Sequence, residues 1–130
     1  MGETFILDTS AVIKYVKGSL SSSGMDLLNR VIEDEPTISI VNRIELLSWK
    51  PPVESDLDLF HLFVNNSNHI PLTESIILKT IEVRREYKLK LPDAIIASTA
   101  LILNRTLLAD NDLDFLRVPN LKYINPRSLS

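Results

Sequence analysis

The chain has 130 residues, of which 45% are hydrophobic, so we expect a single domain spanning residues 1–130 with a sizeable core. A net charge of −3 excludes a generally basic nucleic-acid-binding surface, although it is compatible with a local basic face. The absence of cysteine excludes disulfides and thiolate metal sites. No apolar run reaches the roughly 18 residues of a membrane span and the N-terminus lacks a basic signal region, so we expect a cytoplasmic protein.

Short apolar runs alternate with segments of helical periodicity along the chain. Strands are predicted at residues 4–7, 37–40, 69–72, 105–109 and 121–124, and helices at 11–17, 25–35, 41–49, 54–65, 73–88 and from Pro92 onward. Gly18 and the cluster Ser21–Gly24 predict a flexible loop and a candidate mobile flap, with Ser23 or Gly24 capping the next helix. The alternation predicts an α/β fold with a parallel sheet and helices on both faces.

The helix that begins near Pro92 is apolar around most of its circumference, because only Ser98 and Thr99 are polar between Ala94 and Leu103. Asp93 therefore lies at the N-terminal end of a core helix. Its carboxylate either complements the positive helix terminus, which is worth about 0.3–1 kcal/mol, or helps to bind a cation. Asp93 alone does not decide between these two roles.

Two further acids occupy positions that favour a shared site. Asp8 follows the first buried strand, and ligands gather at the carboxyl ends of parallel strands, although an aspartate there also serves as a helix N-cap. Glu45 shares a predicted helical face with Val41, Ile44 and Ser48, which turns it inward. The alternative for Glu45 is a buried ion pair with Arg43 or Arg84.

Asp110, Asp112 and Asp114 follow the strand predicted at 105–109. Alternate acids of this kind often form a solvated turn. They do not form an EF-hand, because Phe115 and Leu121 occupy the positions that need glycine and a bidentate glutamate. Together with Asp8, Glu45 and Asp93 they make an all-oxygen cluster, which suits Mg²⁺ or Mn²⁺. Two such ions about 3.5–4 Å apart can activate water against a phosphodiester.

Four acidic motifs in order give the chain a family resemblance. They are Leu7-Asp8-Thr9-Ser10, Ile44-Glu45-Leu46-Leu47, Leu91-Pro92-Asp93-Ala94 and Asp110-Asn111-Asp112-Leu113-Asp114-Phe115. This set resembles the PIN-domain ribonucleases, and in particular the VapC-type toxins of prokaryotic toxin–antitoxin pairs. The resemblance implies a PIN-like three-layer α/β/α fold whose central, mainly parallel sheet has four to five short strands. It also implies a Mg²⁺- or Mn²⁺-dependent endoribonuclease.

The resemblance extends to individual site residues. It implies that Asp8, Glu45, Asp93 and a fourth acid hold the metal and carry catalysis, and that Thr9 or Ser10 orients the first carboxylate or a metal-bound water. Counting back from Phe115 favours Asp112 as the fourth acid and Asp110 as the second choice, with Asn111 and Asp114 in support.

The expected partners also follow from the resemblance. They are an RNA substrate, a cognate antitoxin and a second copy of the chain in a homodimer. Cationic candidates for RNA phosphates are Lys14, Lys17, Arg43, Arg84 and Arg85, with Lys50, Lys88 and Arg105 as further choices. Trp49 and its neighbouring apolar residues are the candidate antitoxin surface, unless Trp49 belongs to the core. A catalytically inactive PIN-like interaction module is the alternative function.

Overall fold

The computed structural model describes residues 3–130, so the first two residues of the expected domain lie outside the described part. Its strands are β1 (Phe5–Leu7), β2 (Thr37–Ser39), β3 (Asn68–Ile70), β4 (Thr106–Leu108) and β5 (Tyr123–Ile124). Hydrogen bonds join them into one sheet of order β1-β4-β5 and a pair β2-β3, and every pairing is parallel. Because β1 and β2 are in contact, the two sheets form one central layer. The predicted α/β class with a parallel sheet is confirmed.

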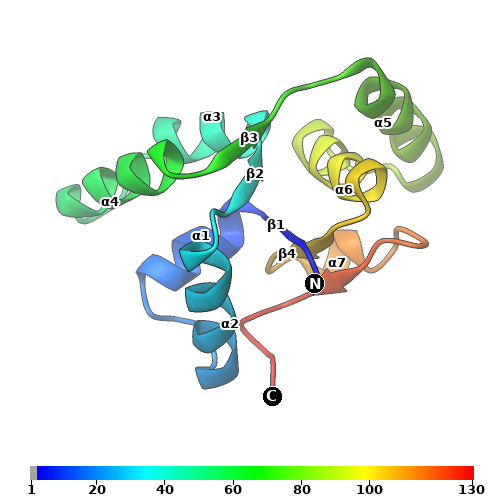
Figure 1. Ribbon diagram of the computed structural model, residues 1–130. Coiled ribbons are helices and arrows are strands. Elements are labelled where there is room, and N and C mark those ends of the chain that lie inside the picture. The colour runs from blue at the N-terminus through cyan, green and yellow to red at the C-terminus, as the bar shows by residue number, and fades with distance from the viewer. Residues whose placement is uncertain (1–2) are drawn as a thin grey trace.

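Seven helices surround this layer: α1 (Thr9–Val16), α2 (Ser22–Glu33), α3 (Ile40–Ser48), α4 (Glu54–Asn65), α5 (Glu74–Tyr87), α6 (Leu91–Leu103) and α7 (Asp112–Phe115). α5 and α6 cover one face of β1 and β4, and α1 and α2 lie on the other (Figure 1). α3 and α4 pack against each other beside β2 and β3. Within residues 3–130, none of the helices has both the length and the apolar character needed to cross a bilayer.

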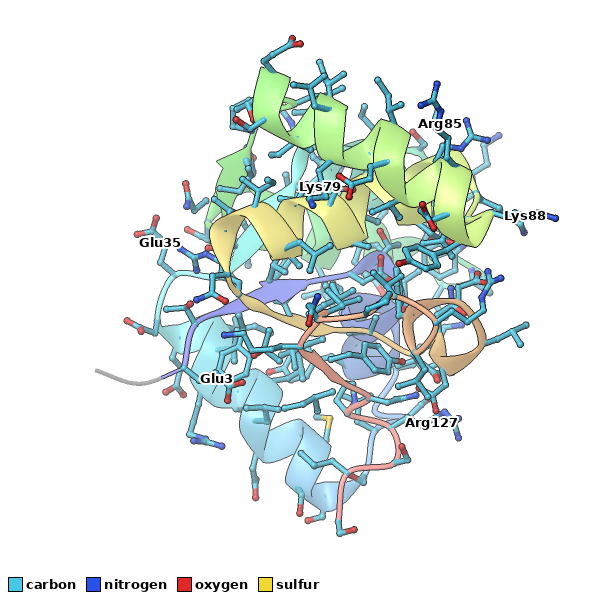
Figure 2. All side chains as sticks on the ribbon, turned by 90° about the vertical axis from the view of Figure 1, so that its right-hand side faces the viewer. Glu3, Glu35, Lys79, Arg85, Lys88 and Arg127 are labelled. Atoms are coloured by element: carbon cyan, nitrogen blue, oxygen red, sulfur yellow. The ribbon has the colours of Figure 1, made fainter. Side chains whose placement is uncertain are left out.

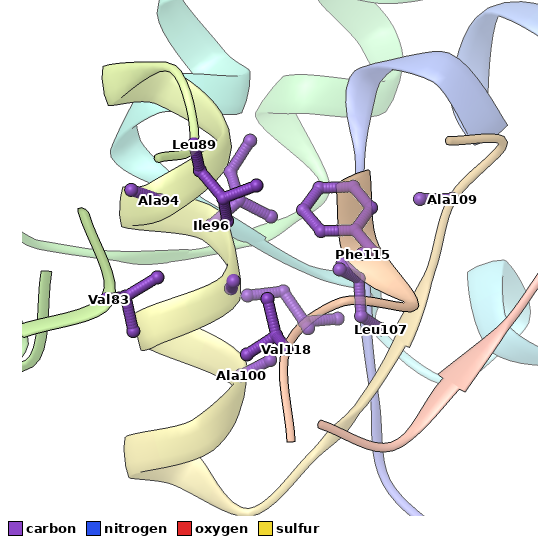
Figure 3. Packing of buried hydrophobic residues seen from close by; sticks show 11 residues of the cluster. Val83, Leu89, Ala94, Ile96, Ala100, Leu107, Ala109, Phe115 and Val118 are labelled. Carbon is purple, nitrogen blue, oxygen red and sulfur yellow. The ribbon is translucent and has the colours of Figure 1, made fainter. Parts of the chain in front are cut away.

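Helix α6 begins one residue before the predicted start at Pro92 and is the most buried helix of the fold. Its side chains at Ala94 and from Ile96 to Ala100 are all buried. Ile96 and Ala97 belong to a cluster with Ile6 and Leu107 of the sheet and with Phe115 of α7 (Figure 3). Burying a side chain the size of Ile96 contributes about 1.5–3 kcal/mol, so this packing holds the N-terminal end of α6, and Asp93 with it, against the sheet.

The Ser21–Gly24 segment is not the predicted loop. Helix α2 begins at Ser22, and Ser21 is its N-cap, because the Ser21 Oγ accepts a hydrogen bond from the Gly24 amide at 3.0 Å. The same hydroxyl donates to the Leu129 carbonyl at 2.6 Å. A Cβ at Gly24 would lie 1.8 Å from the Pro126 carbonyl oxygen, so only glycine permits this close approach of the C-terminal segment. The loop between α1 and α2 therefore ends at Ser21 and does not extend to Gly24, and the predicted cap at Ser23 or Gly24 was wrong.

The inner face of α5 is formed by Ile76, Thr80 and Val83, which are buried, whereas Ile81 is exposed. The helix packs along α6, and Val83 belongs to the same buried cluster as Ala94 and Ala100 of α6. Ile81 therefore contributes to an exposed apolar surface rather than to the core.

Candidate active site

A pocket of about 320 Å³ opens at the carboxyl ends of β1 and β4. Its lining residues come from four segments that are far apart in the sequence: Asp8, Thr9, Ser10, Ile13, Glu45, Asp93, Asp110 and Asn111. Asp8 follows β1 directly, Asp110 lies just beyond β4, and Asp93 lies in the first turn of α6. Parallel pairing of β1 with β4 brings the first two together, and the packing of α6 brings the third.

Asp8 serves both as a helix cap and as a pocket residue. One oxygen, Oδ2, accepts hydrogen bonds from the Ser10 amide at 3.1 Å and from the Ser10 hydroxyl at 2.5 Å. The other oxygen, Oδ1, accepts from the Asn42 amide group at 3.4 Å. Burial raises the pKa of Asp8, and the hydrogen bonds from Ser10 and Asn42 oppose that rise. The predicted capping role and the predicted pocket position are thus both present in one side chain.

Glu45 is half-buried and its Oε1 accepts a hydrogen bond from the Thr9 hydroxyl at 2.7 Å. Burial raises the pKa of Glu45, and the nearby charge of Asp8 raises it further against the effect of the Thr9 hydrogen bond. Neither Arg43 nor Arg84 forms an ion pair with it among the described residues. The alternative of a buried salt bridge is therefore not what the structure contains.

The face of α3 that carries Glu45 differs from the predicted one. Ile44 is 61% exposed and Ser48 is exposed, whereas Asn42 and Leu46 are fully buried. The polar side chain of Asn42 can be buried because its Oδ1 accepts from the Ser39 amide and its Nδ2 donates to Thr9 and Asp8. Glu45 points toward the pocket, but Ile44 does not accompany it into the core.

Asp93 also has an environment in the pocket that disfavours its ionised form. Burial first, then the charges of Asp8 and Asp114, a hydrogen bond with the Asp114 carboxyl group and the charge of Glu45 raise the pKa of Asp93 to about 6. Among residues 3–130, no ion pair involves Asp8, Glu45 or Asp93. The three carboxylates therefore repel one another without compensation from a basic side chain.

The three acids after β4 have different surroundings. Asp110 forms ion pairs with Lys14 and with Arg127, whose Nε lies 3.0 Å from Oδ2. Neither Asp112 nor Asp114 is a lining residue of the pocket. Asp112 accepts hydrogen bonds from the Tyr123 hydroxyl at 2.5 Å and from Asn125 at 3.0 Å. Asp114 is the acid of this loop that acts on Asp93, and it also accepts from the Asn111 side chain at 3.1 Å and pairs with Arg117 at 3.2 Å. The structure thus brings Asp114 to Asp93 and turns Asp112 toward β5.

The donor set suits a hard divalent cation. Asp8, Glu45, Asp93 and Asp114 offer only carboxylate oxygens, and a positive ion would turn their repulsion into attraction. Among the described residues, no group of three acidic, histidine or cysteine side chains lies close enough together to form a preformed metal site. The chemistry of the group fits Mg²⁺ or Mn²⁺, while binding requires the carboxylates to move toward each other.

Some residues around the pocket were not anticipated from the sequence. Asn42 connects the N-terminal ends of α3 and α1, and Asn125, Arg127 and Tyr123 hold the acids after β4. Asn42 could have been found, because it stands three residues after Ser39 and forms a capping box with it. Asn125 and Arg127 carried no local signal, since their partner Asp110 is 15 and 17 residues away.

The predicted cationic residues are dispersed. Lys14 contacts the pocket through Asp110, whereas Lys17 lies over the Trp49 ring at 5.3 Å and Arg84 donates to the Leu89 carbonyl at 3.3 Å. Arg105 donates to the Phe5 carbonyl at 3.3 Å, at the opposite end of the strands. Arg43, Lys50, Arg85 and Lys88 do not line the pocket.

Comparisons with known proteins agree with this architecture. The family model for the PIN domain matches residues 5–121. A toxin–antitoxin complex from Klebsiella pneumoniae contains a chain with a TM-score of 0.71 and 23% identity, covering 98% of this chain and 100% of that one. A chain of VapBC2 from Rickettsia felis, bound to a DNA fragment from its promoter, has a TM-score of 0.75 and 23% identity. The match covers 94% of this chain and 98% of that one. A chain of DNA-bound VapBC from Salmonella typhimurium has a TM-score of 0.78 and 19% identity. The match covers 95% of this chain and 98% of that one. None of the curated proteins matches the sequence significantly.

Proposed function

Because the chain belongs to the PIN-domain family, we propose that it is a metal-dependent endoribonuclease and the toxin of a VapC-type toxin–antitoxin pair. The observation that carries the proposal is the pocket in which Asp8, Glu45 and Asp93 converge without a basic partner. A protein that used these acids only for structure would pair them with cations or expose them to water.

Within this proposal, Asp8, Glu45, Asp93 and Asp114 hold the metal. We assign the fourth position to Asp114 rather than to Asp112 or Asp110, because Asp114 is the acid of its loop that interacts with Asp93. A bound Mg²⁺ or Mn²⁺ supplies positive charge for the phosphodiester and lowers the pKa of an attacking water.

The neighbouring side chains fix the orientation of these ligands. Ser10 holds Oδ2 of Asp8, Thr9 holds Oε1 of Glu45, and Asn111 holds Asp114. Each hydrogen bond restricts the rotation of a carboxylate, which reduces the ordering needed when the site closes. The raised pKa of Asp93, about 6, means that the group is mostly ionised above neutral pH and ready to bind a cation.

The antitoxin partner fits an apolar groove between α1, α2 and α4. This groove has a volume of about 440 Å³ and is lined by Val12, Tyr15, Val16, Met25, Ile32, Pro36, Leu59, Leu62, Phe63 and Asn66. Leu59 and Leu62 are exposed on the α4 side. The neighbours described above are toxin–antitoxin and VapBC complexes, so we propose an apolar antitoxin segment as the occupant.

Trp49 is not part of that groove. Its ring packs on Phe60 with 5.4 Å between centroids, and it lies partly buried against the core cluster that contains Leu46 and Val64. The Lys17 ammonium group covers its outer side. This packing supports a mainly structural role for Trp49, and the Trp49→Ala variant tests it.

A homodimer is the proposed assembly. Large apolar side chains are exposed on and beside α5 and α6, among them Leu72, Leu78, Ile81 and Leu91. Leu72, Ile81 and Leu91 also line an apolar depression of about 200 Å³. A second copy covering this surface would remove it from water.

The test is a cleavage assay on single-stranded RNA with Mg²⁺, Mn²⁺ or EDTA. We expect cleavage with either ion, and its loss in EDTA and in Asp8→Asn and Glu45→Gln. Asp56→Asn, which removes a similarly placed acid from the first turn of α4, is the control and should cleave normally. If the folded wild-type protein cuts no RNA with either ion, the alternative of a catalytically inactive interaction module replaces this proposal.

A further inference from the structure

Two cationic side chains meet on one carboxylate at the rim of the pocket. Lys14 comes from the second half of α1, and Arg127 comes from the segment that follows β5. Both pair with Oδ2 of Asp110, which is itself a lining residue of the pocket. Figure 2 shows Arg127 on the C-terminal segment, on the same side of the molecule as α7.

Asp110 is occupied on both of its oxygens. Oδ2 binds Lys14 and Arg127, and Oδ1 accepts from the Asn125 side chain at 2.7 Å. Burial alone would raise the pKa of Asp110, but the hydrogen bonds from Lys14, Asn125 and Arg127 outweigh it and hold the pKa at about 2. A carboxylate so fully engaged has little capacity left for a metal ion.

The two cations, in contrast, keep free donors. The Lys14 and Arg127 side chains are 35% and 51% exposed, while Asp110 is 11% exposed. Two positive charges pair with Asp110, and the charge of the exposed Asp112 also acts on Arg127, so the positive and negative charges of this cluster balance. The Arg127 guanidinium uses its Nε on Asp110, which leaves its terminal N–H groups available.

A short chain of hydrogen bonds ties this trio to the pocket floor. The Asp110 amide donates to the Ser10 hydroxyl at 3.0 Å, and that hydroxyl donates to Asp8. The trio therefore has a fixed position relative to Asp8. An anion bound by Lys14 and Arg127 would lie beside the acids and not at a remote part of the surface.

We propose that Lys14 and Arg127 form a binding site for a backbone phosphate of single-stranded RNA, and that Asp110 serves as their anchor. This inference rests on the proposed ribonuclease function and adds the residues that bring the strand to the acidic pocket. Such a site is needed because the carboxylates repel the substrate's phosphates until a strand is held close by. Asp110 is thus a positioning residue for substrate binding.

The test is equilibrium binding of a fluorescein-labelled single-stranded RNA dodecamer in EDTA, which prevents metal-dependent cleavage, measured by anisotropy over a range of salt concentrations. Lys14→Ala and Arg127→Ala should each lower the magnitude of the slope of log K against log salt by about 0.7. Near 0.1 M salt, the loss of one such phosphate contact weakens binding about fivefold. Lys79→Ala is the matched control, since Lys79 also forms a surface ion pair but lies on α5.

Further variants separate this role from a structural one. Lys14→Arg and Arg127→Lys keep the charge and should retain the wild-type salt slope. The rise in melting temperature on adding Mg²⁺ should be the same in Arg127→Ala as in wild type, because the proposed metal ligands are untouched.

The outcomes distinguish the two proposals. Wild-type affinity and slope in both alanine variants would overturn the phosphate site, and so would an absence of RNA binding by the wild type. RNA binding that depends on Lys14 and Arg127, without cleavage in any metal, would instead remove the ribonuclease function and leave the phosphate site standing.

Discussion

Asp93→Asn is expected to abolish RNA cleavage and at the same time to stabilise the metal-free protein. The pKa of Asp93 is about 6, against an ordinary 3.8, because burial and the charges of Asp8 and Asp114 disfavour its ionised form. Each pKa unit corresponds to about 1.36 kcal/mol, so the full penalty is about 3 kcal/mol. Asp93 is only half-buried, and solvent screening reduces this to about 1–2 kcal/mol.

The asparagine variant also loses an interaction with the N-terminus of α6, worth a few tenths to about 1 kcal/mol. The net gain is then about 1 kcal/mol, or about 4 °C in melting temperature for a domain of this size. A raised carboxyl pKa destabilises the folded state only at pH values at which the carboxyl group is ionised. The advantage of the variant should therefore be complete above about pH 6 and disappear as the pH falls to about 4.

Thermal melts in EDTA and in Mg²⁺ provide the assay. If the metal binds with millimolar affinity, about a ten-fold excess stabilises the wild type by about 1.4 kcal/mol, and Asp93→Asn should lose most of that response. Asp56→Asn removes an acid from the same position of the first turn of α4 and is the control for a pure helix-terminus effect. An unchanged response to Mg²⁺ in Asp93→Asn would refute the assignment of Asp93 as a ligand.

Three other changes probe the remaining features. Asp110→Asn should be about 1 kcal/mol less stable than wild type near neutral pH, because a lowered carboxyl pKa stabilises the folded state at pH values where the carboxyl group is ionised. In urea unfolding, this difference in stability should vanish as the pH falls through about 2. Trp49→Ala should cost about 2 kcal/mol in stability through lost packing on Phe60, whereas Leu62→Ser should leave stability within about 0.5 kcal/mol but prevent co-purification with the antitoxin encoded beside it. Sedimentation at micromolar concentration should give a dimer for wild type and a 14.7 kDa monomer for Leu78→Arg; a wild-type monomer would contradict the proposed assembly.

The order and type of the elements were determined by local sequence. The apolar run before Asp8 forms a buried strand, Pro92 fits a first helical turn, and α5 begins within one residue of its predicted start at Thr73, because each preference depends on neighbouring residues. The positions of Asp8 and Asp93 followed from the same reasoning. A strand end and a helix start have defined places in a parallel α/β fold, so the meeting of these two acids could be inferred before any distance was known.

Side-chain directions after β4 were decided by tertiary structure. Asp110, Asp112 and Asp114 alternate within five residues and are all acidic, so the local pattern could not show which of them is the fourth metal ligand. Tyr123 and Asn125 draw Asp112 toward β5, and Lys14 with Arg127 occupies Asp110. Asp114, which also pairs with Arg117, is the acid of this loop whose charge acts on Asp93, 21 residues earlier in the chain.

The buried face of α3 was decided in the same way. Hydrophobicity favoured Ile44 as an inward residue, yet Asn42 is fully buried and Ile44 is exposed. The hydrogen bonds of Asn42 to Ser39, Asp8 and Thr9 remove the cost of burying its amide. Two of these partners lie more than 30 residues away along the chain, and only the packing of α1 against α3 brings them within reach.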